Sequence, residues 1–471
     1  MVAIAMGAAT GPAKLQAVED LVNKLSEDLE HVSLLPEARN DALEELKIYG
    51  RDPNYADPIF TNDGITMLLR YSFQNTSDDI SRAALRVMAN AMLLKPETRQ
   101  MFVDQGYPVT ACDRLKTENW DDEFLLSRVL FLCTYDTNID LPLLVENHEL
   151  AERIVNNLER HVKFQLTKQK EKVNSMEEMA LGETLKLLFN VTHFSKSHVS
   201  SFALAVSHIV PLFWKHDISE SKPLDAPFGP LVNSLLNLDL QTELSQLALY
   251  PRDEPHKLTS RLVDLLNKGI RSYSDNDLET VVTPVVSLLG KLYENAPQSV
   301  QQTMRECLLP TADDRQGVLG RSDSLSSHLL KNTTNPTCPA LRDAISHLLF
   351  DLSDKDASKF VENVGYGFAS GFLFQNNVPI PASAAATFNK GDGLGTQKPV
   401  NPITGQFLDM EKFADAPEMT DEEKEREAER LFVLFERLKK TGIVNIQNPV
   451  EMAVQEGRFE ELSDDCVEEL D

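Results

Sequence analysis

The chain has 471 residues, of which 42% are hydrophobic, and a formal net charge of −27 at pH 7. This length exceeds the roughly 250–300 residues that one hydrophobic core normally serves, so we expect several domains or a repeat array. The hydrophobic fraction excludes a chain that is disordered throughout, and the negative charge disfavours a general nucleic-acid binder or a protein that docks on anionic membranes.

The cysteines also limit the classes of protein to consider. The chain has five: Cys112, Cys133, Cys307, Cys338 and Cys466. Their number is odd and they form no Cys-x-x-Cys pair, so neither a disulfide framework nor a structural zinc site is expected. No apolar run reaches the about 20 residues that span a bilayer, and the first residues lack the basic stretch of a signal peptide. We therefore expect a soluble cytoplasmic protein.

The hydrophobic spacing predicts helices along almost the whole chain. Between Ser81 and Leu94, apolar residues recur three and four positions apart and form one wide face, with Asp78 and Asp79 before it as candidate caps. The same unit, an apolar helix followed by a short polar turn and a second helix, recurs at steps of about 40–60 residues. Armadillo and HEAT repeats have a similar length.

We therefore predict an all-α fold, with an armadillo/HEAT-like α-solenoid over residues 1–374. Loop insertions at 168–179, 217–230 and 312–339 would explain the longer steps. The alternative is a series of unrelated helical domains.

The composition changes after Gly371. Residues 375–418 are rich in Pro, Gly, Ala and Thr and have no hydrophobic period, which predicts a linker. Residues 419–471 are expected to form an acidic helical segment. Thr420 and Glu423 make a capping box at the start of an amphipathic helix. Its apolar stripe includes Leu431, Leu434, Phe435 and Leu438.

No motif of covalent or cofactor chemistry is present in the sequence. Gly365, Gly367 and Gly371 faintly resemble a dinucleotide loop, but they follow a helical segment rather than a strand, so we predict a tight connection between helices. There is no Walker A or Gly-x-Ser-x-Gly motif, and His193 and His198 lack companions at metal-ligand spacing. We expect no catalytic residue, no metal and no cofactor.

Four segments stand out in chain order: Gly320–Leu330, Asn363–Leu373, Asn401-Pro-Ile-Thr-Gly405 and Met419–Leu431. They resemble the motifs of the synembryn family, also called resistance to inhibitors of cholinesterase. Segments 181–192 and 231–240 resemble the family's earlier repeats, so the likeness covers about residues 40–460. The composition resembles that of a fungal or other divergent member.

The resemblance implies both a fold and a partner. Synembryns are armadillo/HEAT-like solenoids that bind the α subunits of heterotrimeric G proteins (Gα). They act as guanine-nucleotide exchange factors on GDP-loaded Gα and as folding chaperones for nascent Gα. Animal members carry an acidic Ser/Thr phosphorylation cluster before the Asn-Pro-x-Thr-Gly motif. Residues 376–400 lack this cluster, so kinase regulation at that place is not expected.

In armadillo solenoids the third helix of each repeat lines a concave groove, so polar residues inside these apolar helices are candidates for partner contacts. They are Arg86, Asn90, Arg128, Lys186, Asn190, Asn233, Asn237 and Lys291. Three of the asparagines lie near equivalent helix ends and are candidates for a ladder, since amides donate to and accept from a peptide backbone. The alternative is that each asparagine bonds local carbonyls. The resemblance supplies the ligand, the C-terminal helix of Gα with its free carboxylate.

The sequence leaves two classes of function open. The first is an exchange factor and chaperone that stabilises nucleotide-free Gα, accepts GDP-bound Gα and uses the stripe at 431–438 on a second face of Gα. The second is a non-catalytic solenoid adaptor or tethering scaffold. In the first case we expect a cytoplasmic monomer without nucleic-acid partners, recruited to the cell cortex through Gα.

Overall fold

The structure is a computed structural model, and it describes residues 9–74, 77–167, 174–379, 400–401, 403–411 and 426. The chain divides into two compact units, residues 1–409 and 410–471, and nearly all described residues belong to the first. The described part is helical apart from one isolated bridge between Val400 and Phe407. The expected all-α solenoid is confirmed.

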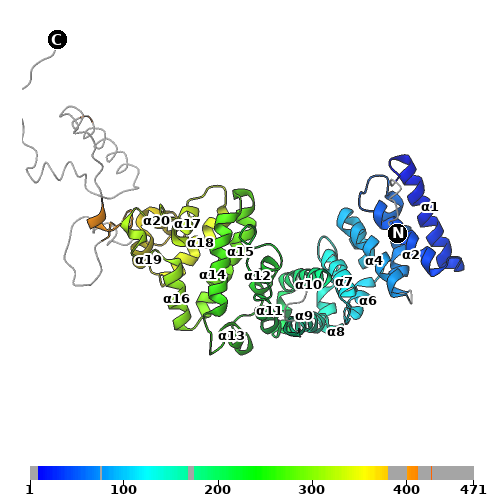
Figure 1. The fold of residues 1–471 in the computed structure, drawn as a ribbon, viewed down its shortest axis with the longest axis horizontal. Helices are drawn as coiled ribbons and strands as arrows, with labels where there is room; N and C mark the ends of the chain where they lie inside the picture. Colours follow the sequence, from blue (N-terminus) through cyan, green and yellow to red (C-terminus); the bar gives the residue numbers. More distant parts are fainter. Residues whose placement is uncertain are drawn as a thin grey trace, which may run out of the picture. The chain divides into compact units, whose positions relative to one another are not determined.

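Seven helices of the first unit form a row in which each helix packs against the next one in chain order (Figure 1). The row consists of α2 (Pro36–Tyr49), α4 (Asp78–Leu94), α7 (Trp120–Cys133), α10 (Ser175–Phe194), α12 (Phe228–Leu236), α15 (Asp275–Asn295) and α18 (Pro339–Leu352). All of them except α2 are helices in which the sequence shows the recurring apolar pattern. Each repeat expected from the sequence therefore contributes one helix to the row.

The other helices pack around this row and connect its members. The α-helices are α1 (Pro12–His31), α3 (Asn62–Phe73), α5 (Glu97–Asp104), α6 (Tyr107–Arg114), α8 (Leu141–Asn147), α9 (Leu150–Thr167), α11 (Ala205–Leu212), α13 (Glu243–Leu249), α14 (Lys257–Ser272), α16 (Gln298–Leu308), α17 (Leu325–Asn332), α19 (Ala357–Val364) and α20 (Tyr366–Gln375). Short 3₁₀ helices are η1 (Asp57–Phe60), η2 (Lys196–Phe202), η3 (Asp314–Gln316) and η4 (Leu408–Met410).

Local side chains fix where the row helices begin. The Asn119 side chain accepts hydrogen bonds from the backbone N–H groups of the first turn of α7, and Asn174 does the same for α10. At α4 the capping prediction differs from the structure. Asp78 and Asp79 lie in the first turn rather than at the cap, where their charges favour the positive end of the helix dipole.

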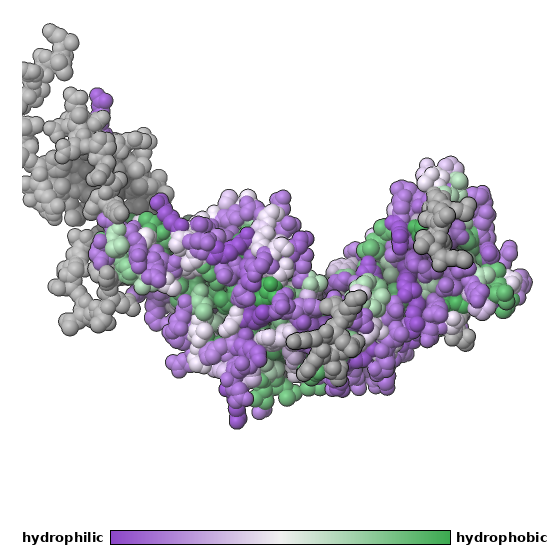
Figure 2. All heavy atoms as spheres, in the orientation of Figure 1, coloured by the Kyte–Doolittle hydropathy of each residue, from purple (hydrophilic) through white to green (hydrophobic). Residues whose placement is uncertain are grey.

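A continuous core of buried apolar side chains runs through the first unit. Leu85 and Met88 of α4, Leu126 of α7 and Leu188 of α10 are all fully buried in it. On the face of the described residues that Figure 2 shows, most residues are hydrophilic and hydrophobic residues occupy smaller areas between them. Burial of one wide face on each helix is what holds the repeats together, at roughly 25 cal/mol per Å² of apolar surface.

Three expected connections have a definite outcome. The segment 312–339 is not only a loop, because it contains α17. Gly365 joins α19 to α20 with φ of 81°, so the predicted tight connection between helices is confirmed. Part of the expected linker, residues 400–401 and 403–407, forms hydrogen bonds with α20 and with the loop around η3. The stripe of Leu431, Leu434, Phe435 and Leu438 lies outside the described residues.

Two general features of the described residues complete the fold. No helix among them is long and apolar enough to cross a membrane. Within the same ranges, no group of three or more His, Cys, Asp or Glu side chains is arranged to hold a metal ion.

Candidate partner-binding face

A set of polar and aromatic side chains on the row helices stays accessible to solvent, and we call it the row face. Its members recur three or four positions apart and are half-buried or exposed. They are Arg82, Arg86 and Asn90 on α4; Asp121, Phe124, Arg128, Phe131 and Tyr135 on or just after α7; Lys186, Phe189 and His193 on α10; Asn233, Leu236 and Asn237 at α12; and Lys291 on α15.

Ion pairs join α4 to α7 on this face. Arg82 binds Asp122 through two nitrogens, Nε and Nη2, at 2.8 and 3.0 Å. Arg86 Nη2 donates to Asp121 Oδ1 at 2.8 Å, and both side chains are about one-third exposed. Arg86, a predicted partner contact, therefore already has a carboxylate partner on the neighbouring helix.

The charges are not balanced between α7 and α10. Arg128 Nη1 and Lys186 Nζ donate to the same oxygen, Oε1 of Glu183, at 2.8 and 2.6 Å. The side chain of Glu183 is 5% exposed, whereas that of Lys186 is 40% exposed. Two cations thus share one carboxylate, which leaves a positive charge at the surface. The structure brings these two predicted residues together.

Aromatic rings surround these cations. The Lys186 ammonium lies 5.3 Å from the centre of the Phe131 ring, and the Arg128 guanidinium lies 5.8 Å from that of Phe124. Phe131 contacts Tyr135 edge to face, and Phe189 stacks on His193. Partner interfaces commonly combine aromatic rings with Arg. These rings were not among the predicted contacts, which were limited to polar residues inside apolar helices. The signal was present as their i, i+3 and i+4 spacing from Arg128 and Lys186.

The asparagines do not form the expected ladder of equivalent amides. Asn190 is 3% exposed and donates to Thr134 Oγ1 at 2.7 Å, so it serves the packing of α10 against α7. Asn237 follows α12 and donates to the Phe189 carbonyl at 3.1 Å. Asn90 and Asn233 are half-buried. The alternative of local carbonyl bonding thus describes Asn237 in part, although its acceptor lies on the neighbouring helix.

Lys291 makes the same kind of contact farther along the row. Its Nζ donates to the Leu236 carbonyl at 2.5 Å, across the junction of α15 with α12. It therefore lies away from the cluster at Arg128 and Lys186 and stabilises the end of α12.

A buried polar network fixes α7 and α10 beneath the row face. His161 of α9 lies between two glutamates, with Nε2 2.9 Å from Oε1 of Glu123 and Nδ1 2.5 Å from Oε1 of Glu177. Arg160 also binds Glu123, and Lys215 binds Glu177. Burial alone would lower the pKa of His161, but the hydrogen bonds that its ring donates to both glutamates, together with their negative charges, outweigh burial and raise the pKa.

The fold is an α-solenoid, and on the row face two cations share one oxygen of Glu183 beside aromatic rings. The chain belongs to the synembryn family: the family model described as "Guanine nucleotide exchange factor synembryn" (Ric8) matches residues 42–458. The family expected from the four sequence motifs is therefore confirmed.

Curated relatives agree with this assignment. A synembryn-like chaperone of Schizosaccharomyces pombe is 29% identical over 309 residues, which are 59% of this chain and 55% of that protein. The chaperone Ric-8A of Macaca fascicularis is 23% identical and that of Gallus gallus 22%. These matches cover 87% and 92% of this chain, and 83% and 88% of the relatives. Among solved structures, an engineered protein matches 80% of this chain and 95% of its own at 15% identity, but a TM-score of 0.33 is too low to bear on the fold.

Proposed function

We propose that this protein is a guanine-nucleotide exchange factor and folding chaperone for Gα subunits, and that it acts without covalent catalysis. The description of its family and the chaperone names of its relatives support this proposal. At the level of residues the proposal rests on the pair Arg128 and Lys186, which share one oxygen of Glu183 beside half-buried aromatic rings.

This arrangement suits an amphipathic helix that ends in a free carboxylate. The carboxylate would bind Arg128 and Lys186, where positive charge exceeds the single buried carboxylate of Glu183. The apolar side of the helix would pack on Phe131, Tyr135 and Phe189. The C-terminal helix of Gα has this chemistry, according to the family resemblance.

Exchange then follows from differential affinity. A solenoid that holds the C-terminal helix of Gα away from its own seat deforms the loop at the guanine base, so GDP leaves. The protein stabilises the empty form until GTP rebinds, and a nascent Gα benefits in the same way. The stripe at 431–438 would contact a second face of Gα. Recruitment of a cytoplasmic monomer to the cell cortex would occur through Gα.

The deciding experiment measures how fast the purified complex with Gα dissociates in GTP, in GDP and without nucleotide. We expect the slowest dissociation without nucleotide and the fastest with GTP, because GTP and the solenoid favour different conformations of one Gα helix. A coupling of about 1–3 kcal/mol corresponds to a 5–150-fold effect. Three equal rates would favour the adaptor and contradict an exchange factor.

A further inference from the structure

Two sequence motifs that the proposed function does not use meet in the structure. They are the glycines at and after the junction of α19 with α20, Gly365 and Gly367, and the Asn-Pro-Ile-Thr-Gly motif about 35 residues later. We call residues 400–407 the anchor turn. Of these, Pro402 lies outside the described residues.

The anchor turn is closed by its own hydrogen bonds. The Asn401 side chain accepts from the backbone N–H groups of Ile403 and Thr404, at 2.8 and 3.3 Å. The Gly405 N–H donates to the Asn401 carbonyl at 2.8 Å, and the Asn401 N–H donates to the Gln406 carbonyl at 2.8 Å. Gly405 has φ of 69°, which favours glycine. The motif is therefore a preformed turn.

Backbone groups of the solenoid bind this turn on two sides. The N–H of Gly367 donates to the Ile403 carbonyl, and that of Leu319 donates to the Thr404 carbonyl, both at 3.2 Å. The N–H of Phe407 donates to the Arg315 carbonyl at 2.9 Å. These contacts join the turn to the start of α20 and to the loop around η3.

The side chain of Arg315 connects the anchor turn to the end of α19. Its Nη1 donates to the Gly405 carbonyl at 3.0 Å, and its Nη2 donates to the carbonyls of Glu362 and Asn363 at 3.1 and 2.9 Å. One guanidinium thus bridges the anchor turn and the end of α19. A lysine has no such fork and cannot make all three contacts from one planar group.

Close backbone approach explains the glycines. A Cβ on Gly365 would lie 3.0 Å from the Ile403 carbonyl oxygen, and its φ of 81° also disfavours a side chain. A Cβ on Gly405 would lie 2.3 Å from Cδ1 of Leu319. The Val-Gly-Tyr-Gly segment therefore forms the seat of the anchor turn.

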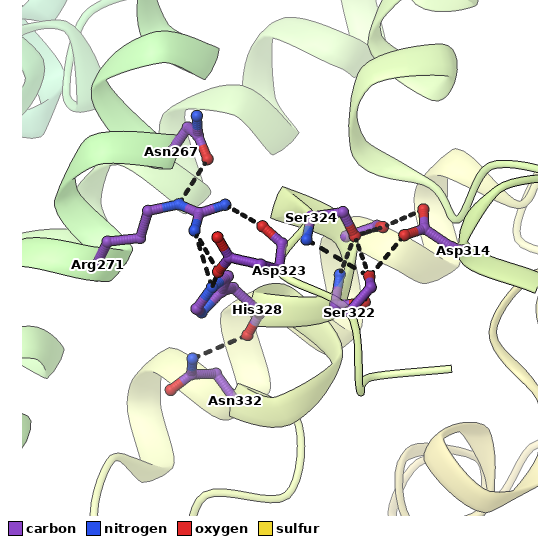
Figure 3. Close-up of polar contacts among 10 residues, drawn as sticks. Asn267, Arg271, Asp314, Ser322, Asp323, Ser324, His328 and Asn332 are labelled. Carbon is purple, nitrogen blue, oxygen red and sulfur yellow. Dashed lines mark hydrogen bonds and ion pairs between the residues drawn. The ribbon is translucent and has the colours of Figure 1, made fainter. Parts of the chain in front are cut away.

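The loop that presents Arg315 is itself held in place (Figure 3). Asp314 accepts hydrogen bonds from the hydroxyls of Ser322 and Ser326, at 2.8 and 2.9 Å. Arg271 of α14 binds the side chain of Asp323 at 2.6 Å. The loop that carries Arg315 is therefore held in place by hydrogen bonds and by an ion pair to α14.

We propose that Arg315 and its glycine seat hold the anchor turn in place. The anchored turn fixes the point from which the acidic C-terminal segment leaves the solenoid. It thereby sets the effective concentration of that segment at a bound partner. This inference rests on the proposed function, in which the segment contacts Gα. With the turn anchored, the tether to Thr420 is about 12 residues, from 408 to 419, instead of about 44, from 376 to 419. Effective concentration falls roughly as the −3/2 power of tether length.

Insertions on either side of the anchor turn test this directly. We would insert 30 Gly/Ser residues either after Ala386 or after Ala414 and measure the affinity for GDP-bound Gα. Only the second insertion lengthens the anchored tether, from about 12 to about 42 residues, so we expect about sixfold weaker binding there and no change for the first. Equal effects, about twofold each for an unanchored tether of 44 residues, would overturn the proposal.

Arg315→Ala tests the clamp, with Arg321→Ala as the matched control because Arg321 is an exposed arginine on the same loop. Hydrogen exchange of the peptide covering 400–407, in the protein alone, should be slow in the wild type and in the control and at least tenfold faster in Arg315→Ala. In the Arg315→Ala background the two insertions should become equivalent. Fast exchange in the wild type would show that there is no anchor.

Failure of the proposed function has a different signature. If truncation after Lys412 leaves Gα binding unchanged, the C-terminal segment does not contact Gα. Both the proposed contact and the proposed effect of the anchor turn on that contact are then overturned. If truncation weakens binding but the two insertions act alike, the segment does contact Gα and only the anchor proposal fails.

Discussion

At the scale of residues, the shared carboxylate of Glu183 decides which predicted contacts are available to a partner. Arg86 has its own acidic partner in Asp121, whereas Arg128 and Lys186 have one carboxylate oxygen between them. Lys186 is also the more exposed of these two cations, at 40% of its side chain against 25%. It is therefore the residue whose replacement tests the row face most cleanly.

We expect Lys186→Glu to weaken binding of a Gα C-terminal peptide about tenfold, equivalent to about 1.4 kcal/mol. A glutamate there repels the peptide carboxylate, but water screens the charge because the site is partly exposed. The measurement is titration calorimetry, with far-ultraviolet circular dichroism to verify that the helices remain. Lys331→Glu on α17, an exposed lysine away from the row face, should bind normally. Unchanged affinity in Lys186→Glu would remove this residue from the site.

At the scale of elements, the network around His161 holds α7, α9 and α10 in register and so positions the row face. Its charged members are Glu123, Glu177, Arg160 and Lys215, all partly or fully buried. Folding raises the pKa of His161 from its ordinary 6.5. Burial alone would raise the pKa of both glutamates, but the hydrogen bonds that they accept from His161 lower it instead. Each group consequently stabilises the fold in a definite range of pH.

The raised histidine pKa predicts a loss of stability at alkaline pH. Its contribution is complete below about pH 6.5 and disappears as the pH rises through the higher pKa of the folded state, by at most about 1.4 kcal/mol per pH unit. The glutamates contribute above their ordinary pKa of 4.5 and lose their contribution as the pH falls through the lowered values. Urea unfolding from pH 2 to 9 should show both declines in the wild type.

His161→Gln is the variant that isolates the alkaline decline. It keeps a hydrogen-bonding side chain but cannot titrate, so its urea midpoint should be lower than that of the wild type at pH 6 and flat between pH 6.5 and 8.5. His208→Gln on α11, a half-buried histidine outside the network, serves as the control and should retain the decline. A decline that persists in His161→Gln would assign it to another group.

At the scale of the whole molecule, the contacts of the anchor turn indicate where the C-terminal segment can be removed without loss of the described packing. Removal of residues 413–471 leaves the contacts of Arg315 and residues 400–407 intact. We expect the thermal midpoint to change by less than about 2 °C, because no described core contact is lost. Gα exchange should slow because the apolar stripe of Leu431, Leu434, Phe435 and Leu438 is absent.

A second truncation after Gln375 separates the two effects. It also removes the anchor turn and exposes the seat at Gly365 and Leu319, so its thermal midpoint should fall, in contrast to that of the first truncation. A truncation after Lys412 that exchanges nucleotide at the full rate would show that the acidic segment is dispensable.

The row of helices was predictable because local spacing determines it. In α4, apolar residues three and four positions apart can face one core only as a helix, and the same pattern recurs in α7 and α10. The glycine connection at Gly365 was likewise predictable from its place between two helical segments. The segment 312–339 was harder, because α17 is short and its buried serines weaken the apolar pattern.

The candidate site was only partly predictable. The pattern of polar residues inside apolar helices found Arg128 and Lys186, but it could not tell Asn190, which packs on Thr134, from a surface amide. Whether such a side chain is available depends on its partner in space, and the partners of Arg128 and Asn190, Glu183 and Thr134, are more than 50 positions away.

The sequence by itself therefore determined the helices, their repeat, their family and the acidic character of the C-terminal segment, because these depend on local spacing and composition. Only the tertiary structure decided that two cations share Glu183 and that Arg315 clamps a turn 90 residues away. Both results depend on a side chain that reaches a group from a distant part of the chain, Arg128 to Glu183 in the first case and Arg315 to the Gly405 carbonyl in the second. Hydrogen bonds between such groups depend on their positions in space and not on their spacing along the chain.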